Sequence, residues 1–503
     1  MKGHKYIFVV GGVMSGVGKG ISTASIGTIL QSMGNKVNLM KVDPYLNVDA
    51  GTMNPKEHGE TFVMNSGLET DQDMGNYERF LNRDLMNADY LTSGMVYKKV
   101  IDKERAGKYG GNCVEAIPHI RDEIIHAYEK SGSINKSDVT IVEIGGTVGD
   151  YQNIMFMEAA RVLKVKNPND VVFIMVSYLP VPSTLGEMKT KPTQNAIRQL
   201  NSYGIHADFV IARSTVPLDS RRKEKLAVQC NVQKENVISA PDISSVYDVP
   251  INFEKDQLGE MIAKKLNLKN KKANLEDWKK FVNKTKNPKS SIKIAVVGKY
   301  FDTGDFVLSD SYLSVIEAIK YSSYYENVKP ELTWINSKKY DDNPKLVKEL
   351  ADFDGVIVPG GFGESGIEGK MAAIKFVREN KIPYLGLCYG MQLMTIEYAR
   401  NVLGIKDANT AEINPDGKNC VIDMMPDQKE KIAKGEFGGT MRLGEYQCFL
   451  RRDTIAEKAY GTSLISERHR HRYEVNPEYI AQLEDAGLVF SGTSKDKRLM
   501  EIA

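Results

Sequence analysis

The sequence has few cysteines, no long apolar run and almost no surplus of charge. Five cysteines are scattered over 503 residues without close pairs, which favours reduced thiols over a disulfide framework or a zinc site. No apolar run approaches 18 residues and the N-terminus leads directly into a strand-like segment, so we expect a cytoplasmic protein without a membrane span or targeting peptide. The 67 basic and 65 acidic residues nearly cancel, which argues against bulk binding of nucleic acid or anionic membranes.

The composition is that of a globular protein, and the length exceeds what one core usually supports. Apolar, β-branched runs alternate with helix-like stretches in two series. The first series comprises residues 6–10, 37–42, 139–144, 171–176 and 209–212, and the second comprises residues 292–297, 332–335, 355–358 and 384–387. Buried strands that alternate with helices predict α/β domains, each with a parallel sheet covered on both faces.

Residues 267–291 separate the two series. They contain eight lysines, Pro288 and a Ser-Ser pair, which favours a solvated linker with a short helix around Trp278. A nucleic-acid-binding patch is the alternative, and a linker fits this composition better.

A glycine-rich turn follows the first apolar run. Residues 11–20 read Gly-Gly-Val-Met-Ser-Gly-Val-Gly-Lys-Gly and precede a helix-like stretch at 21–33. Glycines let the backbone wrap a phosphate, the helix N-terminus supplies N–H donors, and Lys19 supplies a positive charge. The strict Walker pattern is not met, because the spacing before Gly18 is one residue long and Gly20 replaces the usual Ser or Thr. A purely structural turn is the alternative, but the order of strand, glycines, lysine and helix favours a nucleotide site.

An ATP site of this type needs Mg²⁺ held by carboxylate oxygens. Candidates lie in residues 69–73 and 142–150. Glu143 ends an apolar strand, where α/β sheets place ligands, and a charge there is costly unless it binds a cation or is paired. For Asp71 alone, solvent exposure is the better interpretation.

Residues 383–392, Pro-Tyr-Leu-Gly-Leu-Cys-Tyr-Gly-Met-Gln, carry a second chemical signal. An apolar strand enters a Gly-x-Cys-x-Gly turn that opens a helix, and this geometry exposes the Cys388 sulfur where a thiolate is favoured. A cysteine nucleophile needs a histidine as base and then as acid. The only later histidines are His469 and His471, in an Arg/His run at 467–473 that in isolation is more typical of a solvated basic face.

Longer motifs closely resemble CTP synthase. They lie at residues 42–60, 186–194, 438–444 and 467–476, and the resemblance is collinear from residue 6 to about residue 502. It implies a P-loop-type synthetase domain at 1–266, a linker at 267–291 and a class I glutamine amidotransferase α/β domain at 292–503. It also implies ATP-dependent amination of UTP to CTP with glutamine or ammonia as the nitrogen source. ATP phosphorylates O4 of uracil, ammonia adds at C4, and phosphate departs.

The matching motifs carry implied roles in the synthetase domain. Lys19 resembles the catalytic lysine that follows the transferring phosphates, and Asp73 and Glu143 resemble the Mg²⁺ ligands. The implied ATP-binding residues are Ser15, Gly16, Val17, Gly18, Lys19, Gly20, Asp73, Arg213 and Asp242, the Arg213–Asp242 pair belonging to the adenine side. The implied UTP- and CTP-binding residues are Ser15, Asp150, Lys189, Lys191, Gln194 and Lys225. Lys41, Asp43 and His58 fall near the region of phosphate transfer and ammonia entry, although a satisfied buried histidine is the alternative for His58.

In the amidotransferase domain, Cys388 matches the nucleophile that forms a glutamyl thioester. Gly361 and the backbone N–H of Tyr389 resemble the oxyanion hole. Gln392, Glu412 and Arg472 match positions that hold glutamine, and Arg472 suits a bidentate grip on the substrate carboxylate.

The sequence also departs from the family. Relatives carry a later Gln-Phe-His-Pro-Glu motif with the triad histidine and glutamate, which is absent here and which His469 and His471 do not replace. We therefore expect a C-terminally truncated chain with an impaired glutaminase and retained ammonia-dependent synthesis. Smaller departures are Gly16, Gln152 and Tyr389, where serine, an acidic residue and leucine are more usual.

The resemblance further implies feedback inhibition by CTP, activation by GTP, a homotetramer and the capacity to form filaments. Two alternatives remain, one within the enzymes and one in a non-catalytic class. A related phosphate-loop amidotransferase of the dethiobiotin or cobyrinate groups is one, and residues 186–194 argue against it. A non-catalytic, polymer-forming protein is the other, and it predicts nucleotide-dependent assembly without turnover.

Overall fold

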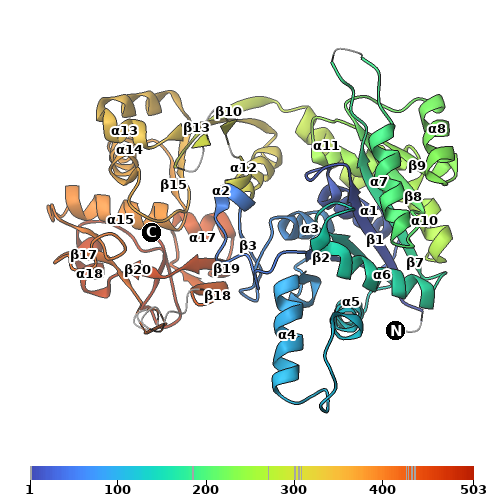
Figure 1. Cartoon of the computed structure of the whole chain (residues 1–503). Coiled ribbons are helices and arrows are strands. Elements are labelled where there is room, and N and C mark those ends of the chain that lie inside the picture. Colours follow the sequence, from blue (N-terminus) through green and yellow to red (C-terminus); the bar gives the residue numbers. More distant parts are fainter. Residues whose placement is uncertain are drawn as a thin grey trace. The chain divides into compact units, whose positions relative to one another are not determined.

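The computed structural model describes residues 3–183, 186–269, 271–299, 302–303, 306–307, 309–425, 428, 430–431, 434 and 438–503. The chain forms two compact units, one comprising Met1–Ala50 and Asp73–Asn283 and the other Gly51–Gln72 and Lys284–Ala503 (Figure 1). The predicted division at 1–266, 267–291 and 292–503 stays a prediction, and the compact units differ from it by placing residues 51–72 with the second unit. None of the described helices is long and apolar enough to cross a membrane.

The first unit contains a parallel seven-stranded sheet, as the alternating apolar runs predict. Its order is β5-β2-β6-β1-β7-β8-β9, and every neighbouring pair is parallel. The strands are β1 (Lys5–Gly12), β2 (Val37–Asp43), β5 (Tyr90–Thr92), β6 (Val139–Ile144), β7 (Val171–Tyr178), β8 (Phe209–Ser214) and β9 (Val237–Pro241). In the central strand β1, Phe8 and Val10 enter one apolar core while Ile7 and Val9 are equally buried, because successive side chains point to opposite faces.

Helices cover both faces of this sheet. They are α1 (Lys19–Ser32), α3 (Asp73–Leu81), α4 (Ser93–Arg105), α5 (Arg121–Ile134), α6 (Ile154–Lys166), α7 (Lys191–Ser202), α8 (Ser220–Cys230), α9 (Val249–Glu254) and α10 (Leu258–Leu266). Helix α1 packs with α3, α9 and α10, whereas α5 packs with α6 and α7 packs with α8. The helix predicted at 21–33 is therefore confirmed, and the glycine-rich turn lies between β1 and α1.

The segment predicted as a linker is less solvated than expected. Helix α11 (Glu276–Lys286) confirms the short helix around Trp278. The Trp278 indole donates from Nε1 to the Tyr247 carbonyl at 2.7 Å, and its ring centroid lies 5.2 Å from that of Phe80. The aromatic face of this lysine-rich helix therefore packs against Tyr247 and Phe80. The Ser-Ser pair lies at the start of the next strand.

The second unit contains a parallel sheet of order β13-β10-β14-β15. Its strands are β10 (Ser290–Gly298), β13 (Val328–Asn336), β14 (Gly355–Val358) and β15 (Tyr384–Gly386). Helices in this unit are α2 (Pro55–His58), α12 (Leu313–Tyr325), α13 (Lys338–Asp342), α14 (Ile367–Glu379), α15 (Tyr389–Asn401), α17 (Ile455–Tyr460) and α18 (Pro477–Asp485). The α/β class expected for both halves is confirmed.

Smaller sheets complete the second unit. One has the order β16 (Asn409–Thr410), β17 (Cys420–Met424), β20 (Tyr473–Val475), and an antiparallel one has the order β19 (Leu464–His471), β18 (Arg442–Leu450), β21 (Gly492–Thr493), β22 (Met500–Ile502). Two-stranded pairs are β3 (Phe62–Val63) with β4 (Glu69–Thr70) and β11 (Asp302–Thr303) with β12 (Phe306–Val307). Strand β19 holds residues 51–72 in place, because Arg470 donates to Glu69 Oε1 at 2.7 Å and Arg468 donates to the Val63 carbonyl at 3.2 Å.

Candidate functional site

The turn between β1 and α1 has the geometry of a phosphate-binding loop. Gly16 and Gly18 adopt positive φ values of 69° and 90°, which glycine tolerates without strain. The Lys19 ammonium donates to the Gly146 carbonyl at 2.9 Å, so it is held at the start of α1. Burial lowers the pKa of Lys19, and the Glu143 carboxylate opposes that shift. A polyphosphate bound by the loop would give this buried charge a partner.

The two predicted metal ligands, Asp73 and Glu143, both bond to the ammonium group of one lysine, Lys41. Lys41 lies opposite Glu143 in the β2–β6 ladder and donates to Glu143 Oε1 at 3.0 Å. Lys41 also donates to Asp73, the first residue of α3. Burial raises the pKa of Glu143, whereas Lys41 opposes this rise. Hard carboxylate oxygens that meet at one cation are a donor set that fits Mg²⁺.

Two carboxylates are fewer ligands than a metal site formed by the protein alone would need. Within the described residues, no group of three or more His, Cys, Asp and Glu side chains could hold a metal ion. Mg²⁺ in phosphoryl-transfer sites is commonly held by one or two carboxylates and by substrate phosphates, so a pair is sufficient.

The structure explains why glycine stands at position 20. A Cβ on Gly20 would lie 2.2 Å from Asp73 Oδ1, so the Asp73 carboxylate occupies the space of a side chain there. The usual Ser or Thr of the Walker pattern is therefore incompatible with this position of Asp73.

Sequence reasoning missed Tyr77 as a member of this site. Its hydroxyl donates to Glu143 Oε2, and it lies one helical turn after Asp73 on α3. The i, i+4 spacing places both residues on one face of the helix, and this was the available signal. Asp43 contributes a carboxylate 3.7 Å from Lys41 Nζ.

Arg213 and Asp242, which are predicted for the adenine side, form a pair, and Arg213 lies near Gly18 of the phosphate loop. Arg213 donates to Asp242 Oδ1 at 2.9 Å, and its Nε would be 3.7 Å from a Cβ on Gly18. In the loop itself Val17 is buried, while Ser15 and Gly16 are exposed.

The predicted UTP and CTP residues divide into outward and inward groups. Lys189 donates to Glu187 at 2.6 Å, and the pKa of the Glu187 carboxyl is lowered first by Lys189 and further by Lys225. Lys191 opens α7 and is exposed. In contrast, Gln194 is buried and donates to Thr190 Oγ1 at 3.1 Å, and Asp150 accepts from the Thr147 amide at 2.6 Å. Lys189 and Lys225 therefore share one basic surface, while Gln194 and Asp150 bond within the fold.

His58 belongs to residues 51–72 of the second unit. Its Nδ1 lies 3.7 Å from Asp71 Oδ2, and its side chain is 28% exposed. His58 is therefore only partly buried, and Asp71 has a neighbour instead of facing solvent alone.

The strand-to-helix elbow at Cys388 is confirmed. Cys388 has φ 52° and ψ −104° between β15 and α15, a strained conformation for a residue with a side chain. A Cβ on Gly390 would lie 2.1 Å from the Val358 carbonyl, and one on Gly386 would lie 2.6 Å from the Gly390 backbone. Both glycines of the Gly-x-Cys-x-Gly pattern are therefore required by close backbone contacts.

The expectation that this elbow favours a thiolate is wrong for the described environment. Burial raises the pKa of the Cys388 thiol to about 11, Glu474 and Glu412 add to the rise, and the Tyr389 amide opposes it. Cys388 retains surface that is exposed to solvent. Its Sγ lies 3.9 Å from the Arg470 carbonyl.

The predicted glutamine residues have these described neighbours. A Cβ on Gly360, next to Gly361, would be 3.7 Å from Cys388 Cβ. Glu412 accepts from the Gly363 amide at 2.6 Å, and Gln392 donates to the Tyr473 carbonyl at 2.9 Å. Arg472 donates to Gln428 at 2.7 Å and to Thr440 at 3.0 Å.

His469 and His471 belong to a separate buried network. His469 Nδ1 lies 2.9 Å from His471 Nε2, and Arg442 lies between Glu474 and Glu501 at 2.9 and 2.7 Å. Burial lowers the pKa of His469 to about 4 and that of His471 to about 3, so both are neutral at physiological pH. Neither has a described hydrogen bond to Cys388.

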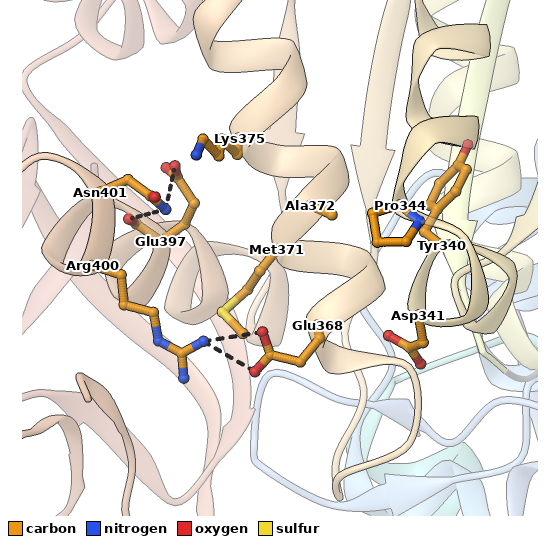
Figure 2. A pocket seen from close by; sticks show the side chains of 10 residues that line it. All are labelled: Tyr340, Asp341, Pro344, Glu368, Met371, Ala372, Lys375, Glu397, Arg400 and Asn401. Atoms are coloured by element: carbon orange, nitrogen blue, oxygen red, sulfur yellow. Dashed lines mark hydrogen bonds and ion pairs between the residues drawn. The ribbon is translucent and has the colours of Figure 1, made fainter. Parts of the chain in front are cut away.

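A cavity of about 260 Å³ in the second unit lies away from the predicted residues (Figure 2). Helices α13, α14 and α15 line it, and Glu368 and Arg400 form an ion pair of 3.0 Å at its edge. No residue predicted for glutamine binding lines this cavity.

Comparisons with known proteins decide the family. A family model for the CTP synthase N-terminus matches residues 5–268, and one for class-I glutamine amidotransferase matches residues 307–503. A CTP synthase of Carboxydothermus hydrogenoformans is 48% identical over 499 residues, which are 99% of this chain and 92% of the relative. The chain belongs to the CTP synthase family. A CTP synthase of Methanocaldococcus jannaschii is 47% identical over 509 residues, 100% of this chain and 92% of the relative.

Among solved structures, the glutaminase domain of a Trypanosoma brucei CTPS with bound acivicin is 34% identical, with a TM-score of 0.38, and the match covers 42% of this chain and 79% of that one. Family membership makes this chain an ATP-dependent ligase with a glutamine amidotransferase domain, which forms CTP from UTP. It implies ATP, UTP and glutamine as substrates and nucleotides as regulators. It also decides between the CTP synthase prediction and the other phosphate-loop amidotransferases. The impaired glutaminase stays a prediction.

Proposed function

We propose that the phosphate loop, Lys19, Asp73 and Glu143 form the site where ATP phosphorylates UTP. The observation that carries this assignment is the convergence of Lys41, Asp73 and Glu143 beside the loop, at the carboxyl ends of β2 and β6. In open parallel sheets ligands bind at this edge. Lys19 holds positive charge against the transferring phosphoryl group, and the loop amides orient the polyphosphate.

Mg²⁺ is the proposed metal, with Asp73 and Glu143 as its protein ligands. When bound, it would neutralise the charge that develops on the phosphates. The Tyr77 hydroxyl fixes the orientation of the Glu143 carboxylate through Oε2. Arg213 and Asp242 flank the nucleotide beside Gly18, and Ser15, Gly16, Val17 and Gly20 supply the backbone of the loop.

For UTP and for CTP as feedback inhibitor, we propose a triphosphate site on the surface that carries Lys189, Lys191 and Lys225. Ammonium groups suit triphosphate oxygens, Lys189 is paired with Glu187 at 2.6 Å, and Lys225 is close enough to lower the pKa of the Glu187 carboxyl further. Gln194 bonds to Thr190, between Lys189 and Lys191, and Asp150 is proposed for the same nucleotide while its carboxylate accepts from the Thr147 amide. Activation by GTP, a homotetramer, filaments and a cytoplasmic location are further proposals that rest on the family.

In the amidotransferase domain we propose Cys388 as the nucleophile, with Gly361 and the Tyr389 amide stabilising the oxyanion. Gln392, Glu412 and Arg472 are the proposed glutamine contacts. The raised pKa of the Cys388 thiol disfavours the thiolate near neutral pH. A polypeptide of residues 1–503 should therefore form the thioester slowly.

CTP formation with two nitrogen sources tests these assignments. A polypeptide of residues 1–503 with UTP, ATP and Mg²⁺ should form CTP with ammonium, and at least about tenfold more slowly with glutamine, because the described thiol is protonated. Cys388→Ala should lose the glutamine-dependent rate and keep the ammonium-dependent one. Equal rates with both sources would contradict the impaired glutaminase, and no CTP with either would favour the non-catalytic alternative.

Gly20→Ala is expected to lower ammonium-dependent CTP formation by about tenfold or more. The new methyl group would lie 2.2 Å from Asp73 Oδ1 and displace this carboxylate, and small displacements in such sites are costly. Initial rates at saturating UTP and ATP measure the effect. Ser25→Ala is the control, because it removes from the same helix a buried hydroxyl that has no hydrogen-bond partner among the described residues. Unchanged turnover in Gly20→Ala would show that Asp73 need not hold this position.

A further inference from the structure

The carboxylates assigned to Mg²⁺ already share a cation supplied by the chain. Lys41 Nζ lies 3.0 Å from Glu143 Oε1 and also donates to Asp73 Oδ2. The side chains of Lys41 and Glu143 are only 7% and 2% exposed, so water cannot replace either group as the partner of the other. A buried carboxylate requires a cation or hydrogen-bond donors, and Lys41 supplies the cation here.

The remaining carboxylate oxygens are also constrained. Glu143 Oε2 accepts from Tyr77, and Asp73 Oδ1 lies against Gly20. The ladder between β2 and β6 fixes Lys41 opposite Glu143, while α3 fixes Asp73 and Tyr77 one turn apart. A divalent cation bound between Asp73 and Glu143 would lie within a few ångströms of the Lys41 ammonium. At so short a separation two positive charges repel strongly.

We propose that Lys41 is an internal counter-ion that keeps free divalent cations away from Asp73 and Glu143 until a nucleotide polyphosphate offers its ammonium new oxygen partners. This role rests on the assignment of the metal to these two carboxylates. The lysine stem is flexible while its Cα is fixed in β2, so Nζ can change partners without movement of the sheet. Lys41 is thus a positioning residue, and the metal enters together with the nucleotide.

Binding of Mn²⁺ in the absence of nucleotide tests the proposal. The probe is Mn²⁺ itself, and the loss of the electron paramagnetic resonance signal of free Mn²⁺ measures binding. Lys41→Met should bind Mn²⁺ at least tenfold more tightly than the wild type, because it removes the ammonium and retains the apolar stem. Lys41→Arg keeps the charge and should show no gain.

Two further variants locate the effect. Adding Asp73→Asn to Lys41→Met should abolish the gain, since it removes one carboxylate of the pair. Lys5→Met removes another lysine paired with a carboxylate, Asp170, from the first strand of the same sheet, and it should leave Mn²⁺ binding unchanged. Because Lys41→Met leaves the buried Glu143 carboxylate and the partly buried Asp73 carboxylate without their counter-ion, Mn²⁺ should also raise its unfolding midpoint more than that of the wild type.

Equal Mn²⁺ affinity in the wild type and Lys41→Met, or an equal gain in Lys41→Arg, would overturn the counter-ion role. Retained tight binding after the added Asp73→Asn substitution would overturn the metal assignment and the proposal with it. Ammonium-dependent CTP formation by the wild type is measured separately. If CTP forms and Lys41→Met shows no gain, the counter-ion role alone fails and the proposed reaction stands.

Discussion

Replacing Lys19 with methionine should reduce CTP formation about a thousandfold, with ammonium as well as with glutamine. The Lys19 ammonium is held 2.9 Å from the Gly146 carbonyl at the start of α1, where we propose that the phosphates of the nucleotide bind. Methionine retains the length of the side chain but cannot neutralise charge in the phosphoryl-transfer transition state, and losses of 10²–10³ or more follow removal of such groups. Initial rates of CTP formation with each nitrogen source measure the loss.

The same substitution should leave the fold intact or more stable. Burial lowers the pKa of Lys19, which means that the folded protein carries an energetic cost for this charge that methionine removes. Lys19→Arg should fail to restore activity, because Nζ already lies 2.9 Å from the position of a Cβ on Gly11 and leaves little room for a guanidinium group. Inactivity that tracks a falling unfolding midpoint would instead indicate that Lys19→Met acts through folding.

Strand prediction from sequence was most accurate where both faces of a strand are buried. Residues 139–144 and 355–358 match β6 and β14, whose residues are all buried. Residues 332–335 captured only the end of β13, which runs Val328–Asn336 at the edge of its sheet. The first half of β13 alternates Lys329, Pro330 and Glu331 with partial exposure, and an edge strand tolerates such residues because one of its sides has no strand partner.

Site residues were predictable from the sequence where they lie close together along the chain, and not where only the fold brings them together. The elbow at Cys388 was readable because its cysteine and both glycines fall within five consecutive residues, 386–390. The cluster at Lys41 was not, because Lys41 and Glu143 meet through the pairing of strands 102 residues apart. The raised pKa of the Cys388 thiol likewise depends first on burial and then on Glu474 and Glu412, and these come from the tertiary fold. Local patterns named the chemistry, but the charges that tune it come from the tertiary fold.

Replacing Lys370 with methionine is expected to stabilise the second unit by about 3 to 5 kcal/mol near neutral pH. Lys370 on α14 is fully buried, and its ammonium has no hydrogen-bond partner among the described residues. The ring centroid of Tyr389 lies 5.6 Å from Nζ and gives it a cation–π contact. Burial, with a smaller effect of Lys299, lowers the pKa of Lys370 from 10.5 to about 7. Methionine keeps the unbranched stem, favours helices and packs well on an aromatic ring.

The gain should depend on pH in a defined direction. An unfolded lysine keeps its proton up to about pH 10.5, whereas the buried one loses it near pH 7, so the unfolded state binds more protons between these values. The wild type therefore becomes more stable as pH rises through this window. The advantage of Lys370→Met is largest at and below about pH 7 and shrinks toward pH 10.5.

Thermal unfolding of the wild type and the variants from pH 6 to pH 10 measures this difference, and contributions of other titrating groups cancel between variants. Near pH 7 a gain of this size should raise the midpoint of the second unit by about 10 °C. Lys375→Met is the matched control, because Lys375 lies on the same helix at the cavity of Figure 2 with its side chain 45% exposed. It should change stability by no more than about 0.5 kcal/mol. A lower midpoint for Lys370→Met at pH 7, or a difference that does not change with pH, would mean that the fold binds this ammonium favourably and that its contact with Tyr389 outweighs the cost of burial.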